Sequence, residues 1–216
     1  MIKKFKDADL EHYEHELNKQ GINLIAGIDE VGRGPLCGPV VTCACILPVG
    51  YHLDGLTDSK QLSERKRNEF AEILKRDAIS YGIGIIDNKR IDEINIREAT
   101  KEAMYMAVSN LSVKPEHVLI DAMPLEKLEI PHTSIIHGDA LSESIAAASV
   151  IAKVTRDNMM YELDKEYPMY GYAKHKGYPT KAHIEAVKKY GVQDFYRMTF
   201  APIKDMIKEN KNEKNN

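Results

Sequence analysis

Residues 26–41 read AGIDEVGRGPLCGPVV, and this stretch decides the fold. An apolar run over residues 22–29 ends in acid, and a second run over residues 38–47 is rich in valine and cysteine. Glycine-rich residues 32–35 separate the two runs. Two apolar runs joined by a glycine-rich turn are typical of an antiparallel β-hairpin. We therefore predict a hairpin with acidic residues at the end of its first strand.

The chain on the C-terminal side of this hairpin alternates between helical and strand patterns. The pattern predicts helices over residues 62–79, 91–111 and 142–166, and strands over residues 81–86, 118–121 and 133–137. Strands that come first as a group and later alternate with helices predict an α/β fold. We expect a mixed five-stranded sheet, antiparallel on one side and parallel on the other, flanked by helices. Small residues around Ala147 should let the helix over 142–166 lie close to the sheet.

Composition divides the chain into four parts. We expect residues 1–21 to form an N-terminal helix over 7–20 packed on the core, and residues 22–167 to form the core itself. Residues 168–207 should form a small C-terminal helical extension, with one helix between Thr180 and Tyr190 and another after Pro202. Residues 208–216 contain only lysine, glutamate and asparagine, so we expect a disordered tail.

Composition also limits the class of protein. A chain of 216 residues with 43% apolar residues can bury one substantial core. It contains neither a long apolar segment nor an apolar N-terminal leader, so we expect a cytoplasmic protein with no membrane partner. A monomer is the default expectation. The net charge of −3 does not by itself indicate a nucleic-acid partner, so local charge must carry that argument.

Three cysteines, Cys37, Cys43 and Cys45, lie close together in the sequence. Their odd number and their spacing fit neither a disulfide framework nor a zinc site. Cys43 and Cys45 would share one face of a strand, where cysteine behaves as a small apolar residue. We therefore expect both to be buried in the core.

Acidic residues stand where predicted strands end: Asp29 and Glu30, Asp121, and Asp139. Carboxylates gathered in one cleft repel one another unless a cation compensates them, and hard oxygen ligands suit Mg²⁺ or Mn²⁺. Two such ions about 4 Å apart could activate a water and stabilise the leaving oxygen in phosphodiester hydrolysis. Two points stay open. Asp139 could simply cap the following helix. Asp29 and Glu30 can share a metal only if the strand ends, twists or bulges between them, because successive side chains of a strand point to opposite faces.

Together with other motifs in the same order, the stretch 26–41 resembles the ribonuclease HII family. The further matches are DSKQLS at 58–63, VLID at 118–121, HGD at 137–139, AASVIAKVTRD at 147–157 and HKGYPT at 175–180. The resemblance covers residues 24–202. It implies an RNase H-like fold in which Asp29, Glu30, Asp121 and Asp139 are the catalytic, metal-binding set for two Mg²⁺ or Mn²⁺ ions.

The resemblance also implies a substrate and its contacts. The expected partner is an RNA/DNA hybrid, or a DNA duplex with an embedded ribonucleotide that is cut on its 5′ side to leave 5′-phosphate and 3′-hydroxyl ends. Gly32, Arg33 and Gly34 are similar to the loop that contacts the ribose 2′-hydroxyl, the group that distinguishes RNA from DNA. Tyr178 matches the tyrosine at the RNA–DNA junction, and Ser59 and Lys60 look like phosphate contacts. These are the expected substrate-binding residues.

Two departures from the family pattern qualify this interpretation. Ala122 stands where the family often has glycine, and His137 where lysine is usual. The sister family, ribonuclease HIII, usually has threonine in place of Arg33 and an additional N-terminal domain, which argues against membership of it. A nucleic-acid-binding protein without activity and a resolvase-like or integrase-like nuclease are competing hypotheses. Lysines near Tyr178 fit a surface that follows phosphates: Lys174, Lys176, Lys181, Lys188 and Lys189.

Overall fold

The computed structural model describes residues 10–213, with the backbone alone for residues 209–213. One five-stranded sheet in the order β3-β2-β1-β4-β5 organises it. The strands are β1 (Ile25–Val31), β2 (Val40–Ile46), β3 (Ser80–Ile86), β4 (His117–Asp121) and β5 (His132–Ile135). The pairs β1–β2 and β2–β3 are antiparallel, whereas β1–β4 and β4–β5 are parallel. The predicted hairpin and the predicted mixed sheet are therefore confirmed.

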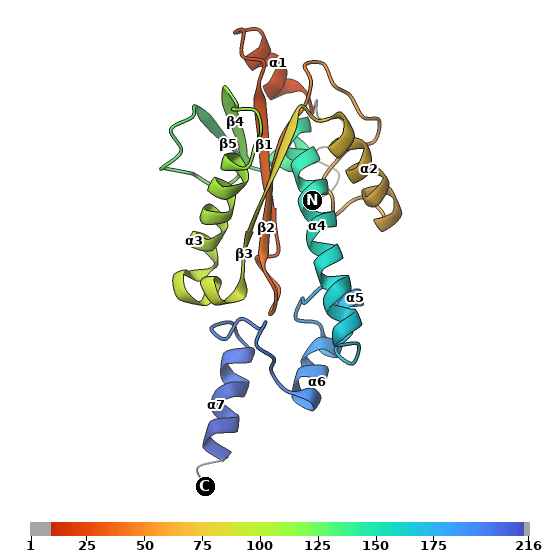
Figure 1. The fold of residues 1–216 in the computed structure, drawn as a ribbon, viewed down its shortest axis with the longest axis vertical. Helices are drawn as coiled ribbons and strands as arrows, with labels where there is room; N and C mark the ends of the chain where they lie inside the picture. Colours follow the sequence, from red (N-terminus) through yellow and green to blue (C-terminus); the bar gives the residue numbers. More distant parts are fainter. Residues whose placement is uncertain (1–9, 214–216) are drawn as a thin grey trace.

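Helices cover both faces of this sheet (Figure 1). The helix α3 (Asn88–Ser109) lies on one face, and α2 (Glu64–Asp77) and α4 (Glu143–Glu166) lie on the other. Side chains alternate accordingly, because successive residues of a strand point to opposite faces. Ala26, Ile28 and Ala44 pack in one apolar cluster with Met104 of α3. Cys43 and Cys45 pack in another with the alanines of α4, and both are buried and free, as predicted.

The close packing of α4 depends on small residues on both sides. A Cβ added at Gly27 of β1 would lie 2.1 Å from the carbonyl carbon of Ser144. Real side chains do not come that close, so only glycine allows the helix backbone to rest on the strand. Ala146, Ala147 and Ala148 of α4 are fully buried. The prediction that small residues bring this helix against the sheet is confirmed.

Side-chain caps determine where several helices begin. Ser63, Ser142 and Thr180 each accept a hydrogen bond from a backbone N–H in the first turn of α2, α4 and α6 (Lys181–Tyr190), respectively. These caps satisfy donors that would otherwise lack partners inside the helix. The predicted bounds of these helices are confirmed to within two residues. The N-terminal helix α1 (His12–Asn18) is shorter than the predicted 7–20, and residues 7–9 of that prediction lie outside the described residues.

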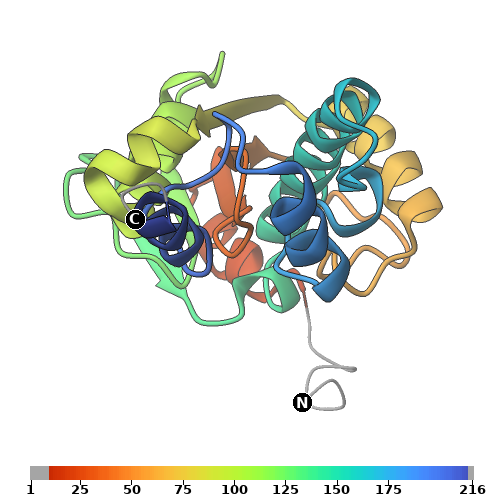
Figure 2. The ribbon, with the colours of Figure 1, turned by 90° about the horizontal axis from the view of Figure 1, so that it is seen from below.

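The C-terminal extension lies at the end of the sheet where β1 finishes, and Figure 2 looks at that end. It contains α5 (Tyr172–His175), α6 and α7 (Ile203–Glu213). Its apolar side chains around Tyr172, Tyr196 and Ile203 form a cluster that also includes Leu36, Cys37 and Met160 of the core. Because α7 runs through residue 213, the prediction of disorder from residue 208 is wrong for 208–213, and 214–216 lie outside the described residues. Lysine and glutamate favour helix once buried Ile203 anchors its start.

No helix among residues 10–213 combines the length and the apolar character needed to cross a bilayer.

Candidate active site

Asp29 is a buried carboxylate near the carboxyl end of β1. The register of β1 with β2 continues without a bulge from Ala26 to Val31, so Asp29 keeps the orientation of a regular strand residue. It faces α4, where Ser149 hydrogen-bonds to its carboxyl group. The hydroxyl oxygens of Ser149 and Ser59 form a buried hydrogen-bonded pair, 2.9 Å apart. Ser149, which is not among the predicted site residues, therefore orients the carboxylate.

Glu30 follows Asp29 on an unbroken strand, so the two side chains leave β1 on opposite faces. Its backbone N–H donates to Oδ1 of Asp29 at 2.7 Å. Its Oε1 lies 3.4 Å from Nη1 of Arg33, at the start of the glycine-rich loop. Both carboxylates are nevertheless close enough to Asp121 for its negative charge to raise their pKa values. The two acids therefore approach the end of β4 from the two sides of the strand.

Asp121 is the last residue of β4, the parallel neighbour of β1. Parallel pairing of Ile28 with Ile120 brings the carboxyl ends of the two strands to one edge of the sheet. Oδ1 of Asp121 accepts a hydrogen bond from the backbone N–H of Gly138 at 2.7 Å. The next residue, Ala122, has φ of 50°, a left-handed conformation that favours glycine. Glycine, which the family pattern described above often has at this position, would adopt this conformation without strain.

Asp139 lies in a short 3₁₀ helix (Gly138–Ala140) that follows β5, and it is buried. It does not cap α4, because Ser142 does so. Its Oδ2 lies 3.6 Å from Nζ of Lys60. Asp58 is close enough to Asp139 for its negative charge to raise the pKa of Asp139, and Nζ of Lys60 lies 3.8 Å from Oδ1 of Asp58. Asp58 is thus a fifth carboxylate beside the predicted set. Its place in the DSKQLS motif was the only signal for it in the sequence.

Electrostatics favour a bound cation here. Burial is the largest cause that raises the pKa of each of the four predicted acids. Neighbouring carboxylates add to it, and for Asp139 burial with the charges of Asp58 and Asp121 raises the pKa to about 6. Each shift indicates that negative charge at this site is poorly compensated. Hard carboxylate oxygens that repel one another in this way suit a divalent ion such as Mg²⁺ or Mn²⁺.

The four acids do not form one compact coordination sphere. All four are described, and no three of them place one oxygen each within 4.8 Å of one another. Mg²⁺ is usually held by one or two carboxylates together with water and substrate phosphate, so the four acids do not need to converge on one point. The donor set is therefore compatible with the two-ion expectation.

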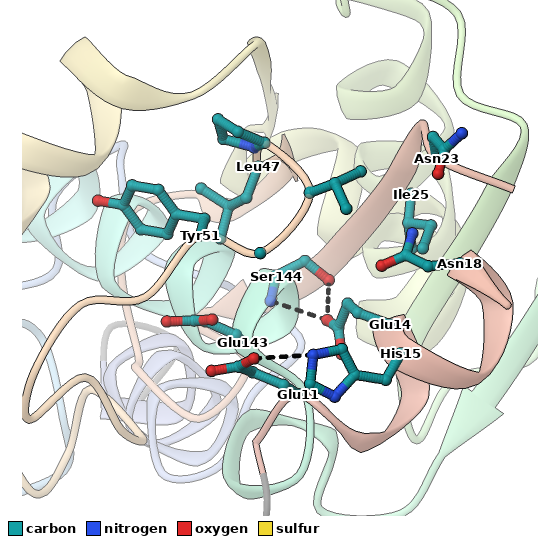
Figure 3. A pocket seen from close by; sticks show the side chains of 13 residues that line it. Glu11, Glu14, His15, Asn18, Asn23, Ile25, Leu47, Tyr51, Glu143 and Ser144 are labelled. Carbon is teal, nitrogen blue, oxygen red and sulfur yellow. Dashed lines mark hydrogen bonds and ion pairs between the residues drawn. The ribbon is translucent and has the colours of Figure 1, made fainter.

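One His–carboxylate group among the described residues is more compact, and it lies elsewhere. Ligand atoms of Glu11, His52 and Glu143 come within 4.8 Å of one another. Glu11 and Glu143 line a pocket with Glu14, His15 and Ser144 (Figure 3). Each ring nitrogen of His52 lies 3.0 Å from a carboxylate, those of Glu11 and Asp54, so the imidazole links α1 to the loop after β2. Glu143 is six residues before Ser149 on α4, about 9 Å along the helix.

The glycine-rich loop and Tyr178 lie side by side, although the sequence separates them widely. A Cβ added at Gly34 would lie 3.4 Å from Cε1 of Tyr178, and the N–H of Leu36 donates to the carbonyl oxygen of Gly177 at 2.8 Å. The side chain of Arg33 is half exposed, and Tyr178 is 39% exposed. Gly32 has φ of 96° and requires glycine. The loop and the tyrosine thus form one surface beside Glu30.

Two of the predicted phosphate contacts, Ser59 and Lys176, differ from the prediction, whereas Lys60 is exposed, in agreement with it. The hydroxyl of Ser59 is buried against Ser149, so it supports Asp29 rather than standing free for a phosphate. The side chain of Lys60 is exposed beside Asp139. Lys176, expected on a phosphate-binding surface, is buried with Nζ 3.7 Å from the ring centroid of Tyr161. That expectation is wrong for Lys176, because its charge packs on an aromatic ring.

Comparisons with known proteins show which family and which fold this chain resembles. A family model described as Ribonuclease HII matches residues 26–203. The chain is 60% identical over 200 residues to the Ribonuclease HII of Bacillus cytotoxicus, a match that covers 93% of this chain and 77% of that protein. The crystal structure of the ribonuclease H2 from Pyrococcus horikoshii is similar with a TM-score of 0.75 and 27% identity, over 87% of this chain and 98% of that one.

A more distant structural neighbour shows the same fold. Bst-RNase HIII in complex with Mn²⁺ is similar with a TM-score of 0.65 and 18% identity, over 88% of this chain and 71% of that one. The region matched by the family model contains the four predicted acids, the glycine-rich loop and Tyr178, together with nearly the whole sheet.

Proposed function

The chain belongs to the ribonuclease HII family and is thus an endoribonuclease, and from that premise we propose its substrate and its site. It hydrolyses the RNA strand of RNA/DNA hybrids and cuts duplex DNA on the 5′ side of an embedded ribonucleotide. The products carry 5′-phosphate and 3′-hydroxyl ends. The protein acts as a monomer and uses Mg²⁺ or Mn²⁺.

One observation carries the proposal: Asp29, Glu30 and Asp121 meet at the end of two parallel strands, with Asp139 beside them. These four carboxylates would hold the divalent ions. Ions bound there would activate the attacking water and stabilise the leaving oxygen. The residues of the chain provide the geometry. Ser149 orients Asp29, and the N–H of Gly138 orients Asp121.

The substrate contacts follow from the surface beside the acids. The N–H groups of Arg33 and Gly34 donate to no described residue, so they are available to a ribose 2′-hydroxyl. Tyr178 lies against Gly34 and can pack on the neighbouring deoxyribose. Lys60 brings a positive charge next to Asp139, where a phosphate would lie.

The test is cleavage of a DNA duplex with a single ribonucleotide, in Mg²⁺ or Mn²⁺ and with EDTA. We expect one cut on the 5′ side of the ribonucleotide, no cut with EDTA, and no cut in an all-DNA duplex. Asp29→Asn and Asp121→Asn should each lower turnover by at least about 10³-fold, because each removes a charged ligand. Asp54→Asn, at a fully exposed carboxylate away from the site, is the matched control and should keep full activity.

Three results would contradict the proposal. Near-normal turnover by Asp29→Asn would show that the four carboxylates are not needed for the reaction. Cleavage of the all-DNA duplex would indicate a resolvase-like nuclease. Binding without any cleavage would indicate a protein that recognises nucleic acid and does not process it.

A further inference from the structure

Two arginines are completely buried beneath the glycine-rich loop, and neither contacts the four acids. Arg156 belongs to α4, and Arg197 lies in the segment between α6 and α7; both have 0% exposure. All eight of their hydrogen bonds go to backbone carbonyl oxygens. Burial lowers the pKa of both guanidinium groups, that of Arg197 to about 10, so both remain charged at neutral pH.

Arg197 holds the loop from below. Its guanidinium donates to the carbonyl oxygens of Gly32 at 2.6 Å, Arg33 at 3.0 Å and Pro35 at 2.8 Å. It also donates twice to the carbonyl oxygen of Gly38, at 2.9 and 3.1 Å. A residue that spans the loop in this way turns these carbonyl groups toward the protein interior. The N–H groups of Arg33 and Gly34 are left without an acceptor among the described residues.

Arg156 connects the loop to the segment that carries Tyr178. It donates to the carbonyl oxygens of Pro39 at 3.1 Å, Cys37 at 3.2 Å and Lys176 at 2.9 Å. Its side chain passes directly under Gly32, where an added Cβ would lie 2.3 Å from Nε of Arg156. The first glycine of the loop is therefore required by the arginine below it as well as by its positive φ.

Both guanidinium groups satisfy backbone carbonyl oxygens that apolar side chains would leave without a donor. Burying a charged guanidinium costs free energy that its hydrogen bonds only partly return, so a buried arginine needs well-placed acceptors. The planar guanidinium offers five donors in a fixed arrangement. That arrangement matches a set of carbonyl groups that no strand or helix satisfies. The two side chains therefore determine the shape of the loop.

We infer that Arg156 and Arg197 are positioning residues for ribonucleotide recognition, because they hold the loop carbonyls inward and the N–H groups of Arg33 and Gly34 outward. Arg156 in addition holds the loop and the Tyr178 segment at a fixed separation. The inference rests on the proposed function, in which the loop contacts the 2′-hydroxyl. It assigns specificity to two residues that do not touch the substrate.

The experiment measures discrimination by binding, in an Asp29→Asn background that does not cut. The readout is the ratio of the Kd for an all-DNA duplex to the Kd for the same duplex with one ribonucleotide. Arg197→Lys should lower this ratio by about fivefold, the value of one or two lost hydrogen bonds to the ribose. Its affinity for the all-DNA duplex should not change, because phosphate contacts lie elsewhere. Arg90→Lys, on the surface of α3, is the matched control and should keep the ratio.

Arg156→Lys tests the connection to Tyr178. In the active background it should raise KM for a single-ribonucleotide duplex about fivefold more than for a long hybrid, since only the former requires the tyrosine beside one ribose. Circular dichroism and thermal unfolding establish that each variant folds. If Arg197→Lys does not fold, Phe200→Leu is the second test. Cζ of Arg197 lies 5.0 Å from the ring centroid of Phe200, so loss of the ring removes a contact that holds the guanidinium in place. This variant should lower the ratio of the two Kd values about twofold.

The outcomes separate the two proposals. If the Asp29→Asn protein with both arginines does not discriminate between the duplexes, the proposed function fails. If it does discriminate and a folded Arg197→Lys or Phe200→Leu variant keeps the ratio, the positioning role is overturned. Equal losses of affinity for both duplexes would indicate a merely structural role and would overturn it as well.

Discussion

The contact between Gly27 and α4 allows a prediction that joins fold and activity. Gly27→Ala places a Cβ at 2.1 Å from the carbonyl carbon of Ser144, 2.2 Å from the backbone nitrogen of Ile145 and 2.4 Å from the carbonyl oxygen of Ser144. All three neighbours are backbone atoms in the first turns of α4. They can move away only if the whole helix moves, so the strain cannot be relieved by rotation of a side chain.

The size of the effect follows from these distances. Carbon atoms in contact are about 3.5 Å apart or more, so α4 must move by about 1.4 Å. Overpacking of this kind costs about 3 kcal/mol, which for a chain of this length lowers Tm by about 6–12 °C. Ser149 moves with the helix and draws away from Asp29. A displacement of about 1 Å in a catalytic site can lower turnover about 10²-fold.

The assay combines thermal unfolding with cleavage of the single-ribonucleotide duplex, measured well below the Tm of the variant. Gly50→Ala is the matched control, because an added Cβ there meets nothing within 4 Å and φ is 70°. It should cost only the strain of a left-handed alanine, about 1 kcal/mol, and leave turnover unchanged. A Gly27→Ala protein with the Tm and turnover of the unaltered chain would refute the close packing of α4 on β1.

Three further predictions test the site and its surroundings. Ser149→Ala removes a hydrogen bond that lowers the pKa of Asp29, so the acidic limb of the pH–rate profile should move to higher pH; an unchanged profile would contradict this. Burial raises the pKa of Glu143 to about 7, so the folded state binds this proton more tightly than the unfolded chain, and stability should fall as pH rises from about 4.5 to 7. Glu143→Gln should flatten this pH dependence and raise the free energy of unfolding by about 1–2 kcal/mol near pH 8. If the Tm of the variant does not rise at that pH, the buried charge of Glu143 is not the cause of the pH dependence. Tyr178→Ala should slow cleavage at a single ribonucleotide about tenfold more than cleavage of a long hybrid, and equal losses would argue against a junction contact.

Local patterns in the sequence were sufficient for most of the elements. The hairpin of β1 and β2 follows from two apolar runs around a glycine-rich turn, and Ser63, Ser142 and Thr180 mark helix starts through hydrogen bonds to residues three positions later. Such signals act over a few residues, so they can be read without the fold. The exception is α7, where helix continues beyond the apolar residues because lysine and glutamate tolerate it.

The sequence by itself also determined which acids stand at strand ends, because Asp29, Glu30 and Asp121 each follow an apolar run. Only the tertiary structure decided what surrounds them. Ser149 contacts Asp29 across 120 positions of sequence, Asp58 joins Asp139, and Tyr178 lies against Gly34. Arg156 and Arg197 carry no local signal of their role, since their partners are carbonyl groups that every residue has. A contact of that kind exists only when packing brings distant backbone to a buried donor, and periodicity along the chain does not encode it.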